Sequence, residues 1–461
     1  MTDHAPSLSQ EIADRAAAAL GGVPAQVDRA ARLHLLDALA VGSLGSARGP
    51  VRGLAALAAS APDGPCSVIG LGRQVPAPVA ALVNGGFIHS LEYDDTHVAS
   101  VMHGSSLLAP AVLAVAEATR SSGATALRAY AVGWEVLIRF GLAAPGALQA
   151  RGFQTTSAAG PFVAALVSAL LDGDPQLGVQ AMGIAGIQPG GTFAFLAEGD
   201  TVKALQPGWA ASAGLQAADL ARAGVTGPRR VLDGEFGFFR LFAGDGGEPV
   251  QRMRRELATL GERWYLPDAA FKLVPCCHFI HPFVEALQGL VDDGLDQRDI
   301  ARIVCHVPTG EAPVIADPWP TRQAPAKPHD GRWSLPYVLA GQLTDGAVTV
   351  ELFERPVTPE KIAVARLIEH EPWPGSGFPA RFPARIGVEL RDGTTMRAAV
   401  DDVLGGPSRP VSEAAVVAKA RQNLRLAGVA AAAAGQVLSE LLERPDPDLR
   451  QVLHLLAVRP A

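Results

Sequence analysis

The sequence predicts a mainly α fold, in which a large all-helical domain is built from both ends of the chain and a smaller α+β domain is inserted between them. Three observations predict this arrangement. Helical spacing of apolar residues dominates up to about Arg263, strand-like patterns appear only beyond that point, and helical spacing returns from Val411 onward. We place the all-helical domain at residues 1–266 and 405–461, and the α+β domain at residues 267–404.

The N-terminal part has the pattern of a series of packed helices. Ser7 stands just before the first periodic apolar residues, and a hydroxyl at that position is typical of a helix cap. Further on, apolar residues recur at i, i+3, i+4 and i+7 on more than one side of each segment, which favours helices buried inside a bundle. The predicted helices are Val27 to Leu44, Ala77 to Leu91, Ser105 to Thr119, Thr125 to Leu142 and Ala158 to Leu171.

The segment after Pro267 mixes strand and helix patterns. Ile300 to Val307 is expected to form a strand, and an Asp-Gly turn at Asp392 is expected to join the two strands of a hairpin over residues 385–400. Helical spacing is seen at His278–Leu290 and Thr358–Glu369. A Gly-Pro-rich linker at residues 404–410 then leads back to helices.

Composition restricts the class of protein. The chain has 461 residues, of which 48% are hydrophobic, so it is long and apolar enough for a large core. Charged residues are 18%, below the usual ~25%, which excludes a disordered chain or a coiled coil. A formal net charge of −7 argues against nucleic acid as a partner, because phosphate binding needs a basic face.

The N-terminal sequence, the length of the apolar stretches and the number of cysteines bear on the cellular compartment. The N-terminus lacks a basic segment followed by an apolar one, so we expect no signal peptide. Apolar stretches such as Ala158 to Leu171 are shorter than the ~20 residues that cross a bilayer, so we expect no membrane association. Four cysteines in so long a chain do not form a disulfide framework. These features predict a cytoplasmic protein.

Lysine is scarce. Lysine and arginine together number 39, and only five are lysines. A coding bias toward GC-rich codons accounts for the excess of arginine, and it makes each lysine a position where arginine was the default. The five are Lys203, Lys272, Lys327, Lys361 and Lys419.

The densest polar cluster runs from His89 to His103. It holds three carboxylates and three imidazoles between a helix C-terminus and the next helix, whose N-terminal amides are suited to an anion. The alternative is a structural role, in which Asp and Ser cap helix ends. Asp94 and Asp95 also suggest a terpene-cyclase-like acidic motif, but no further carboxylate follows at helical spacing, so that interpretation is weak.

A second cluster runs from Lys272 to His281 and contains adjacent cysteines, Cys276 and Cys277. Two cysteines and two histidines are enough for zinc, but adjacent cysteines point in different directions and lack the gap of a zinc hook. We therefore favour buried cysteines at a helix start and predict no metal.

Three weaker segments carry other candidate residues. Lys203 and Gln206 lie at a glycine-punctuated helix start where a carboxylate could bind, Gln154 precedes hydroxyls that open a helix, and Tyr337 follows a Ser-Leu-Pro turn. The alternative for Lys203 is an exposed loop lysine, and the segments of Gln154 and Tyr337, taken alone, are better explained by structural roles. No phosphate-binding loop, dinucleotide fingerprint, nucleophile elbow or His-Glu-x-x-His pattern is visible.

Taken in order, the motifs resemble the MmgE/PrpD family, which contains 2-methylcitrate dehydratase, cis-aconitate decarboxylase and iminodisuccinate epimerase. The matching motifs include the Asp-Asp-Thr-His segment that begins at Asp94, the Gly-Phe-Gln segment that ends at Gln154, the lysine segments, and the Ser-Leu-Pro-Tyr segment that ends at Tyr337. The resemblance implies a helical domain with a lid-like α+β domain, a homodimer, and a site between the domains for a small di- or tricarboxylate. It implies no metal or organic cofactor.

The resemblance also assigns roles to residues. It implies that the catalytic group consists of His103, Asp94, Thr96, Lys203, Lys272 and Tyr337. It implies that the substrate is bound by Asp95, His97, Gln154, Gln206, Cys277 and His281. Lysines would offset the negative charge that builds up when a proton leaves the carbon beside a carboxylate, and His103, with a pKa near the working pH, would take that proton.

Four positions differ from the usual family pattern. Gln154 and Gln206 stand where histidine is common, so two groups able to shuttle protons are replaced by amides. Gly104 replaces the proline that often follows His103, which predicts a looser loop after the base, and Glu92 replaces the more usual aspartate. These differences bear on the substrate more than on the reaction class.

The resemblance predicts a lyase that removes water from a 2-methylcitrate-like hydroxy acid. Decarboxylation of a cis-aconitate-like acid and epimerisation of an acid such as iminodisuccinate share the same carbanion and remain alternatives. The glutamines raise a further alternative, a biosynthetic enzyme with a larger or less charged substrate. A non-catalytic protein that binds a small acid is the alternative of another class.

Overall fold

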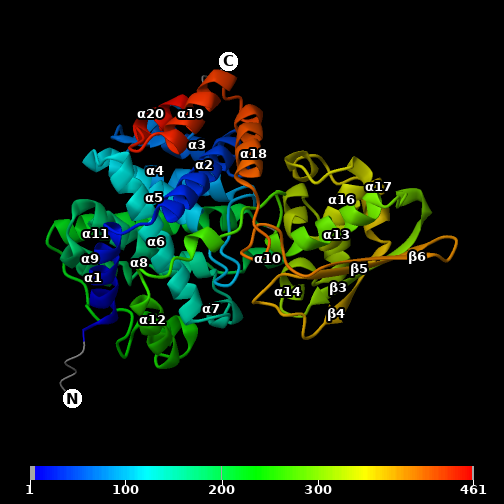
Figure 1. Cartoon of the computed structure of the whole chain (residues 1–461), viewed down its shortest axis with the longest axis horizontal. Helices are drawn as coiled ribbons and strands as arrows, with labels where there is room; N and C mark the ends of the chain where they lie inside the picture. Colours follow the sequence, from blue (N-terminus) through cyan, green and yellow to red (C-terminus); the bar gives the residue numbers. More distant parts are fainter. Residues whose placement is uncertain (1–5, 199, 459–461) are drawn as a thin grey trace.

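The structure, a computed structural model, describes residues 6–198 and 200–458. It has two lobes (Figure 1). The larger lobe contains helices from both ends of the chain, and the smaller one carries a four-stranded sheet. Each lobe has its own buried apolar cluster, one around residues such as Leu36 and Phe162, the other around Ile303 and Val338. The predicted domain boundaries remain a proposal.

The N-terminal helices of the larger lobe match most of the predicted segments. Ser7 caps the first of them, since its hydroxyl accepts a hydrogen bond from the Gln10 amide. The helices are α1 (Leu8–Leu20), α2 (Ala25–Arg48), α3 (Leu54–Ser60), α4 (Ala77–His89), α5 (Gly104–Thr119), α6 (Gly123–Ala143), α7 (Ala147–Ala150), α8 (Thr155–Asp172), α9 (Pro175–Ala185), α11 (Gln206–Arg222) and α12 (Glu248–Ala258).

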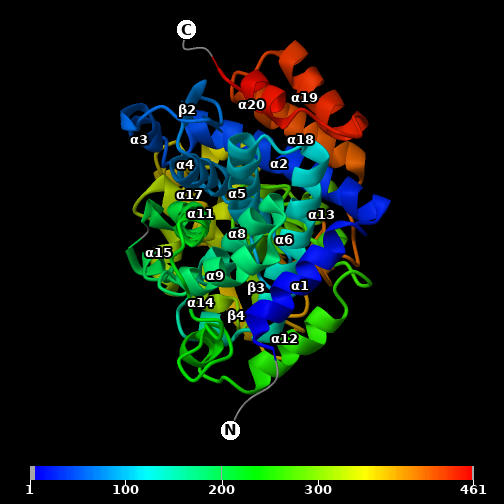
Figure 2. The same cartoon turned by 90° about the vertical axis from the view of Figure 1, so that its left-hand side faces the viewer.

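Three C-terminal helices complete the larger lobe: α18 (Glu413–Leu426), α19 (Ala431–Glu443) and α20 (Leu449–Leu455). Helices α18 and α19 pack against α2, and α20 packs against α19, α5 and β1 (Figures 1 and 2). The contact includes a buried ion pair, in which Lys419 on α18 lies 2.9 Å from Asp37 on α2. The two ends of the chain are therefore joined inside one lobe.

The larger lobe is not all-helical, so that part of the predicted fold class is wrong. Strands β1 (Cys66–Val68) and β2 (Arg73–Val75) pair antiparallel within it. The Asn84 side chain bonds the backbone of Ser67 and Ile69, and Gly70 and Gly72 adopt positive φ in the turn. Three-residue strands are too short for their alternation to stand out in the sequence.

Helix α8 is long and apolar enough to cross a membrane by length and composition alone. Of its 18 residues, 89% are buried inside the protein, against α5, α6, α9 and α11. Its apolar surface is therefore covered by other helices, as in the core helix of a bundle.

The smaller lobe is built on a mixed sheet of order β4-β3-β5-β6, in which β3 pairs parallel with β4 and antiparallel with β5. The strands are β3 (Ile300–Pro308), β4 (Ile368–Trp373), β5 (Ala384–Leu390) and β6 (Thr395–Val400). The predicted strand and the Asp-Gly hairpin are both confirmed. The helix expected over Thr358–Glu369 is only partly right, because α17 ends at Ala365 and β4 begins at Ile368.

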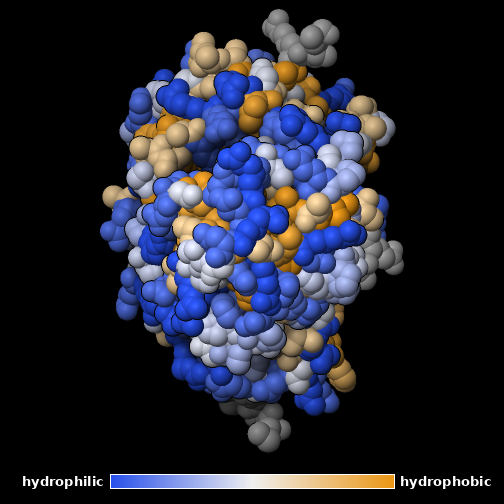
Figure 3. All heavy atoms as spheres, turned by 90° about the vertical axis from the view of Figure 1, so that its right-hand side faces the viewer, coloured by the Kyte–Doolittle hydropathy of each residue, from blue (hydrophilic) through white to orange (hydrophobic). Residues whose placement is uncertain are grey.

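Short helices surround this sheet: α10 (Phe195–Glu198), α13 (His281–Asp292), α14 (Ala312–Ile315), α15 (Trp319–Gln323), α16 (Leu335–Asp345) and α17 (Pro359–Ala365). Helix α13 packs on β5 and β6 and also on α16. The opposite face of the sheet carries exposed charged residues, including Arg302 and Glu389. Figure 3 looks at this end of the molecule, where hydrophilic residues cover most of the face and hydrophobic ones gather near its middle.

The two lobes meet along the chain between α4 and α5. Thr96 forms backbone hydrogen bonds in both directions with Ala270, at 3.0 and 2.9 Å. From the smaller lobe, the buried Arg332 guanidinium donates to the carbonyls of Leu91, at 2.6 Å, and Pro275, at 2.7 Å. These contacts bring the residue 89–103 segment against the residue 270–277 segment.

Candidate active site

Two imidazoles face one carboxylate at the junction of the lobes. His89 is the last residue of α4, His103 immediately precedes α5, and Asp94 lies in the loop between them. The Oδ2 atom of Asp94 is 2.8 Å from Nδ1 of His89 and 3.4 Å from Nδ1 of His103. The two rings meet edge to face, with centroids 4.8 Å apart. Asp94 therefore positions both rings.

Two threonines fix His103 further. Its backbone amide donates to the Thr156 hydroxyl at the start of α8, at 2.9 Å, and its Nδ1 lies 3.3 Å from the Thr96 hydroxyl. With Nδ1 facing Asp94 and Thr96, the hydrogen-bond pattern assigns the proton to Nδ1 and leaves Nε2 free. The free Nε2 atom is the one able to exchange a proton with a ligand.

Burial controls the charges of this group. Burial lowers the pKa of His103 to about 4, and the neighbouring Asp94 only partly offsets it. For Asp94 burial acts in the opposite direction, but the two histidines outweigh it and hold its pKa well below the usual range. At neutral pH the ligand-free site thus holds a neutral His103 beside a charged Asp94. The pKa near the working pH that we expected for His103 is not what the structure gives.

Two buried lysines share one glutamate. Oε1 of Glu92 contacts Nζ of Lys203, and Oε2 lies 3.3 Å from Nζ of Lys272. Lys272 is fully buried, and Lys203 and Glu92 are nearly so. Burial alone would raise the pKa of Glu92, but the two lysines outweigh it and hold that pKa well below its ordinary value. Burial lowers the pKa of Lys272, yet Glu92 and Asp94 reverse the effect and leave it raised.

The lysines and the histidines form one network. Nζ of Lys203 lies 3.0 Å from Nε2 of His89, whose Nδ1 faces Asp94. Because an ammonium can only donate, Nε2 of His89 accepts and its Nδ1 donates to Asp94. The chain Lys203–His89–Asp94–His103 therefore joins a cation to the free imidazole. The ring of Trp333, from the smaller lobe, lies 5.6 Å from Nζ of Lys203.

The ligand atoms of His89, Asp94 and His103 lie within 4.8 Å of one another, close enough to bind a metal ion. However, both Nδ1 atoms face Asp94 and an ammonium faces the remaining nitrogen of His89. These donors are committed to hydrogen bonds, so the residues fit a proton-transfer site better than a metal site. The predicted absence of metal and cofactor remains a prediction.

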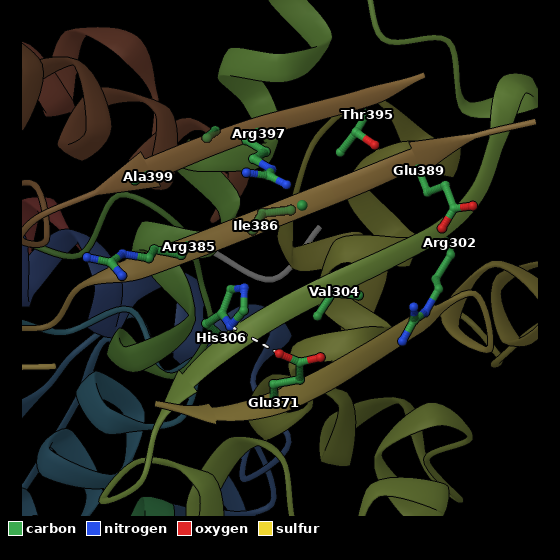
Figure 4. Close-up of a pocket in the computed structure, with 12 residues that line it drawn as sticks. Arg302, Val304, His306, Glu371, Arg385, Ile386, Glu389, Thr395, Arg397 and Ala399 are labelled. Atoms are coloured by element: carbon green, nitrogen blue, oxygen red, sulfur yellow. Dashed lines mark ion pairs between the residues drawn. The ribbon is translucent and has the colours of Figure 1, made fainter. Parts of the chain in front are cut away.

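This site is separate from a large surface hollow. A cavity of about 620 Å³ lies on the outer face of the four-stranded sheet. Figure 4 shows side chains of β3, β4, β5 and β6 around it, with His306 and Glu371 paired at 3.5 Å. Arginines at residues 302, 385 and 397 line it, and none of the residues of the histidine–lysine network does.

Comparison with known proteins identifies the family. The family model for the MmgE/PrpD N-terminal domain matches residues 10–250, and that for the MmgE/PrpD C-terminal domain matches residues 274–444. The chain belongs to the MmgE/PrpD family. Of the network residues, His103, Asp94 and Lys203 lie in the first matched range, and Lys272 lies between the two ranges.

Several relatives are similar over most of their length. The "cis-aconitate decarboxylase-like protein oryM" of Aspergillus oryzae is 36% identical over 84% of this chain and 83% of the relative. Cis-aconitate decarboxylase of Aspergillus terreus is 30% identical over 83% of this chain and 82% of its own length. The enzyme of that name from Homo sapiens is 30% identical over 76% of this chain and 73% of its own length. The chain is therefore an enzyme of the MmgE/PrpD family.

The residues that the family resemblance assigned to catalysis fall in two places. Five of the six lie in or beside the network: His103, Asp94, Thr96, Lys203 and Lys272. Tyr337 lies apart, in the apolar cluster of the smaller lobe, where its hydroxyl donates to the Leu352 carbonyl at 3.3 Å. That hydroxyl already has a backbone partner.

The residues assigned to binding are more scattered. Asp95 bonds His34 at 2.7 Å and the Ser105 amide at 3.1 Å, which caps α5. His97 bonds Ser100 at 2.8 Å, and burial lowers its pKa to about 3. Both side chains thus have local partners, and the structure does not bring them into the histidine–lysine network.

The two glutamines have partners of their own. Oε1 of Gln154 accepts from the Ser157 amide at 2.6 Å and so caps α8. The Nε2 atom of Gln206 donates to the Thr192 carbonyl at 2.9 Å, whereas its Oε1 is buried and lacks a hydrogen-bond partner among the described residues. Gln206 therefore keeps one acceptor available.

In the second cluster, burial raises the pKa of the Cys277 thiol to about 12. The nearby charges of Glu92 and Lys272 act on this pKa in opposite directions. This thiol stays neutral. His281 bonds the Cys276 carbonyl at 3.3 Å. His278, next to Cys277, is buried and neither ring nitrogen has a partner in the part of the chain described here.

Sequence reasoning missed three members of the site. Glu92 and His89 were noted in the polar cluster but not assigned a role, and Arg332 lies beside the Ser-Leu-Pro-Tyr motif. The density of polar residues from His89 to His103 was the available signal. The pairing of Glu92 with two lysines more than a hundred residues away had no signal in the sequence.

Proposed function

We propose that this protein is a cofactor-independent decarboxylase of a cis-aconitate-like unsaturated acid. The observation that carries the proposal is the buried network in which two lysines and a His103–Asp94 pair come together. Relatives that span four-fifths of the chain are named for cis-aconitate decarboxylation, which supports this choice among the reactions of the family.

The reaction can be written on an acid whose leaving carboxylate is one carbon removed from a C=C bond. The C–C bond to that carboxylate breaks and CO₂ leaves. The electron pair moves through the alkene, the double bond shifts toward the carbon that lost CO₂, and negative charge appears at the far alkene carbon beside another carboxylate. A proton added at that carbon completes the product. The protein must therefore offset an anion and supply one proton.

Lys203 and Lys272 are suited to the first task. Their ammonium groups lie in a buried region, where fixed cations stabilise a developing carbanion more than they do in water. Neither lysine needs to give up its proton for this role.

His103 is suited to the second task. Its Nε2 atom has no hydrogen-bond partner among the described residues, and Asp94 holds the ring from the other side. The carboxylates of a bound substrate would raise the pKa of His103, because opposite charge nearby favours the imidazolium. Substrate binding then loads the proton that His103 delivers.

One observation favours a second candidate, dehydration of a 2-methylcitrate-like hydroxy acid. The low pKa of His103 keeps the imidazole neutral in the ligand-free protein, as a general base requires. In that reaction His103 removes a proton beside a carboxylate and hydroxide leaves from the next carbon. Epimerisation would return the proton to the other face instead.

The test is a panel of cis-aconitate, 2-methylcitrate, citrate and iminodisuccinate, followed by NMR in heavy water with CO₂ measured separately. Release of CO₂ with one deuterium in the product supports decarboxylation. Loss of water from 2-methylcitrate without CO₂ supports dehydration instead. Deuterium exchange without net reaction supports epimerisation. If no acid reacts or exchanges but one binds, the non-catalytic alternative holds. His103→Gln is the control and should abolish turnover.

A further inference from the structure

A buried guanidinium of the smaller lobe has no carboxylate partner. Arg332 is 1% exposed, and burial lowers its pKa only to about 10, so it is charged at neutral pH. Its hydrogen bonds go to the carbonyls of Leu91 and Pro275, and it forms no ion pair within the described residues. Arg139, which is similarly buried, by contrast bonds Glu135 at 2.5 Å. Since a buried charge is costly unless an opposite charge lies beside it, Arg332 is suited to an anionic ligand.

The unused donors of this guanidinium lie on one edge. Both hydrogen bonds come from Nη1, Nε is buried without a partner, and Nη2 makes no hydrogen bond to any described residue. The Cζ atom lies 4.6 Å from the centroid of the Phe353 ring. Because Nε and Nη2 share an edge of the planar guanidinium, their N–H groups can donate in parallel to both oxygens of one carboxylate. Arg332 can therefore hold a carboxylate while Nη1 keeps its two backbone partners.

His329 accompanies Arg332 on the 3₁₀ helix η6 (Pro328–Trp333). Side chains three residues apart eclipse each other on such a helix, so the two residues share one side of η6. The Nδ1 atom of His329 is buried without a partner, and its Nε2 forms no hydrogen bond in the part of the chain that the structure describes. Its ring packs edge to face on Trp333, with centroids 5.1 Å apart. An imidazole with two unused nitrogens thus lies on the same side of η6 as the unused edge of Arg332.

This side of η6 faces the histidine–lysine network. Nη1 of Arg332 bonds the carbonyl of the residue just before Glu92, and the Trp333 ring lies 5.6 Å from Nζ of Lys203. Burial lowers the pKa of His329 to about 3, and the charges of Arg332 and Glu92 also act on it. The smaller lobe therefore contributes a guanidinium and an imidazole to the region of Lys203 and Glu92.

The cations of this region differ in their partners. The ammonium groups of Lys203 and Lys272 share the carboxylate of Glu92, whereas Arg332 contacts only carbonyls and a phenyl ring. A ligand with two carboxylates thus meets two kinds of cation, a pair of ammonium groups and a guanidinium edge without an anion.

We propose that Arg332 and His329 form a second carboxylate-binding half of the site, which holds a carboxylate that stays on the substrate while the lysines act at the reacting end. The guanidinium edge binds both oxygens of that carboxylate, and His329 donates one further hydrogen bond to it. The proposal rests on the proposed function for the class of substrate, an acid with at least two carboxylates. Both residues bind substrate, and neither moves a proton in the reaction.

The experiment measures what a second carboxylate contributes to binding. Succinate and glutarate are compared, by calorimetric titration of the full-length protein, with their monomethyl esters, which keep most of the shape of the acid and lose one charge. At least one diacid should bind about tenfold or more tighter than its ester, because the ester cannot make a bidentate, charge-assisted contact. A ratio near one for both acids in the unmodified protein overturns the proposal.

Two variants test whether this ratio depends on η6. His329→Gln removes an imidazole that has no hydrogen bond to the rest of the described protein, and Arg332→Lys keeps the charge but loses the parallel pair of donors. Each should lower the ratio, Arg332→Lys by about threefold or more. A thermal melt identifies folded variants, and His329→Gln alone decides the test if Arg332→Lys does not fold. An unchanged ratio in a folded variant, with both ligands weakened equally, means a structural role and contradicts the proposal.

The matched controls lie on the outer face of the four-stranded sheet. His306→Gln changes an imidazole paired with Glu371, and Arg302→Lys changes a guanidinium paired with Glu369. Both should leave the ratio unchanged. A similar fall of the ratio in either control would show that it does not depend on η6 and would overturn the proposal.

Turnover provides an independent readout. With an acid that reacts, His329→Gln should raise KM and leave kcat nearly unchanged, because it removes an interaction that substrate and transition state share. A fall of kcat at constant KM contradicts the proposal. If no acid reacts, yet the ratio falls in the η6 variants and not in the controls, the proposed function fails and this half of the site stands.

Discussion

At the scale of single residues, His103 combines a free ring nitrogen with a pKa of about 4 in the ligand-free protein. The role proposed for it in decarboxylation requires the imidazolium in the complex. Since kcat/KM reports on the free enzyme, the protonated fraction of His103 falls about tenfold per pH unit above that pKa. We expect kcat/KM for decarboxylation, corrected for ionisation of the substrate, to decrease as pH rises from 5 to 7.

An increase of kcat/KM with pH would identify a different active form of His103. If kcat/KM increases as pH rises through about 4 and then stays level, the neutral imidazole is the active form and His103 acts as a base. That profile favours dehydration over decarboxylation. The profile of kcat, which reports on the complex, should shift to higher pH in the first case because bound carboxylates raise the pKa of His103.

Lys203 gives a second prediction at this scale. Its ammonium contacts Glu92 and His89 together, a geometry that a planar guanidinium does not reproduce. Lys203→Arg should remain folded and lose at least about tenfold in kcat/KM, as measured by steady-state kinetics beside a thermal melt. Lys327→Arg, at an exposed lysine, is the control. Normal turnover by Lys203→Arg would mean that only the charge matters.

Lysine scarcity did not distinguish lysines of the site from lysines with a structural role. Lys203 and Lys272 are indeed buried in the network, but Lys419 is equally buried and pairs with Asp37 and the Tyr93 carbonyl. Likewise Asp94 and Asp95 are adjacent in the sequence, yet one faces the two imidazoles and the other caps α5. Sequence pattern locates such residues, but the direction of each side chain depends on packing that the pattern does not contain.

At the scale of elements, the start of α5 positions His103. A Cβ at Gly104 would lie 2.5 Å from ring atoms of Trp134, so the expected loosening of this loop is not found: Gly104 is buried at a tight contact. Gly104→Ala should lower the free energy of unfolding by about 1–3 kcal/mol and reduce kcat, because the strain displaces the neighbouring imidazole. Denaturant titration and kinetics measure the two effects.

The matched control is Gly53→Ala, where a Cβ meets nothing within 4 Å. If both alanine variants behave alike, the contact with Trp134 does not restrain His103.

Long elements were predictable and short ones were not. The buried helices follow from apolar periodicity, which extends over ten or more residues. The hairpin follows from its Asp-Gly turn between two alternating segments. Strands β1 and β2 have three residues each, and β4 continues a pattern that had looked helical. Their formation depends on partners, such as β3 for β4, that lie far away in the sequence.

At the scale of the whole molecule, large apolar side chains are exposed around α9 and α11 of the larger lobe. Trp209 is 61% exposed, Ile187 is 80% exposed and Phe236 is 81% exposed. Trp209 lies on α11, Ile187 follows α9, and Phe236 lies in a loop that packs on the end of α9; α9 and α11 pack against each other. An exposed apolar face of this kind is typical of an interface between copies.

The homodimer that the family resemblance implies can be tested on this face. Light scattering after gel filtration should give a dimer for the unmodified protein and a monomer for Trp209→Glu combined with Phe236→Glu, because charges at a buried interface are costly. Leu57→Glu changes an exposed leucine on α3 and serves as the control; this variant should stay dimeric. A monomeric unmodified protein at micromolar concentration would refute the dimer.

The pair between Asp37 and Lys419 has a consequence for biosynthesis. The two residues are 382 positions apart, so α2 leaves the ribosome long before its cation exists. Burying a carboxylate without a cation costs several kcal/mol of folding free energy. We therefore expect the larger lobe to complete its folding only after α18 emerges from the ribosome. Apart from α10, the smaller lobe is one continuous segment and is complete earlier. Limited proteolysis of ribosome-bound chains should find the middle of the sequence protected before its beginning.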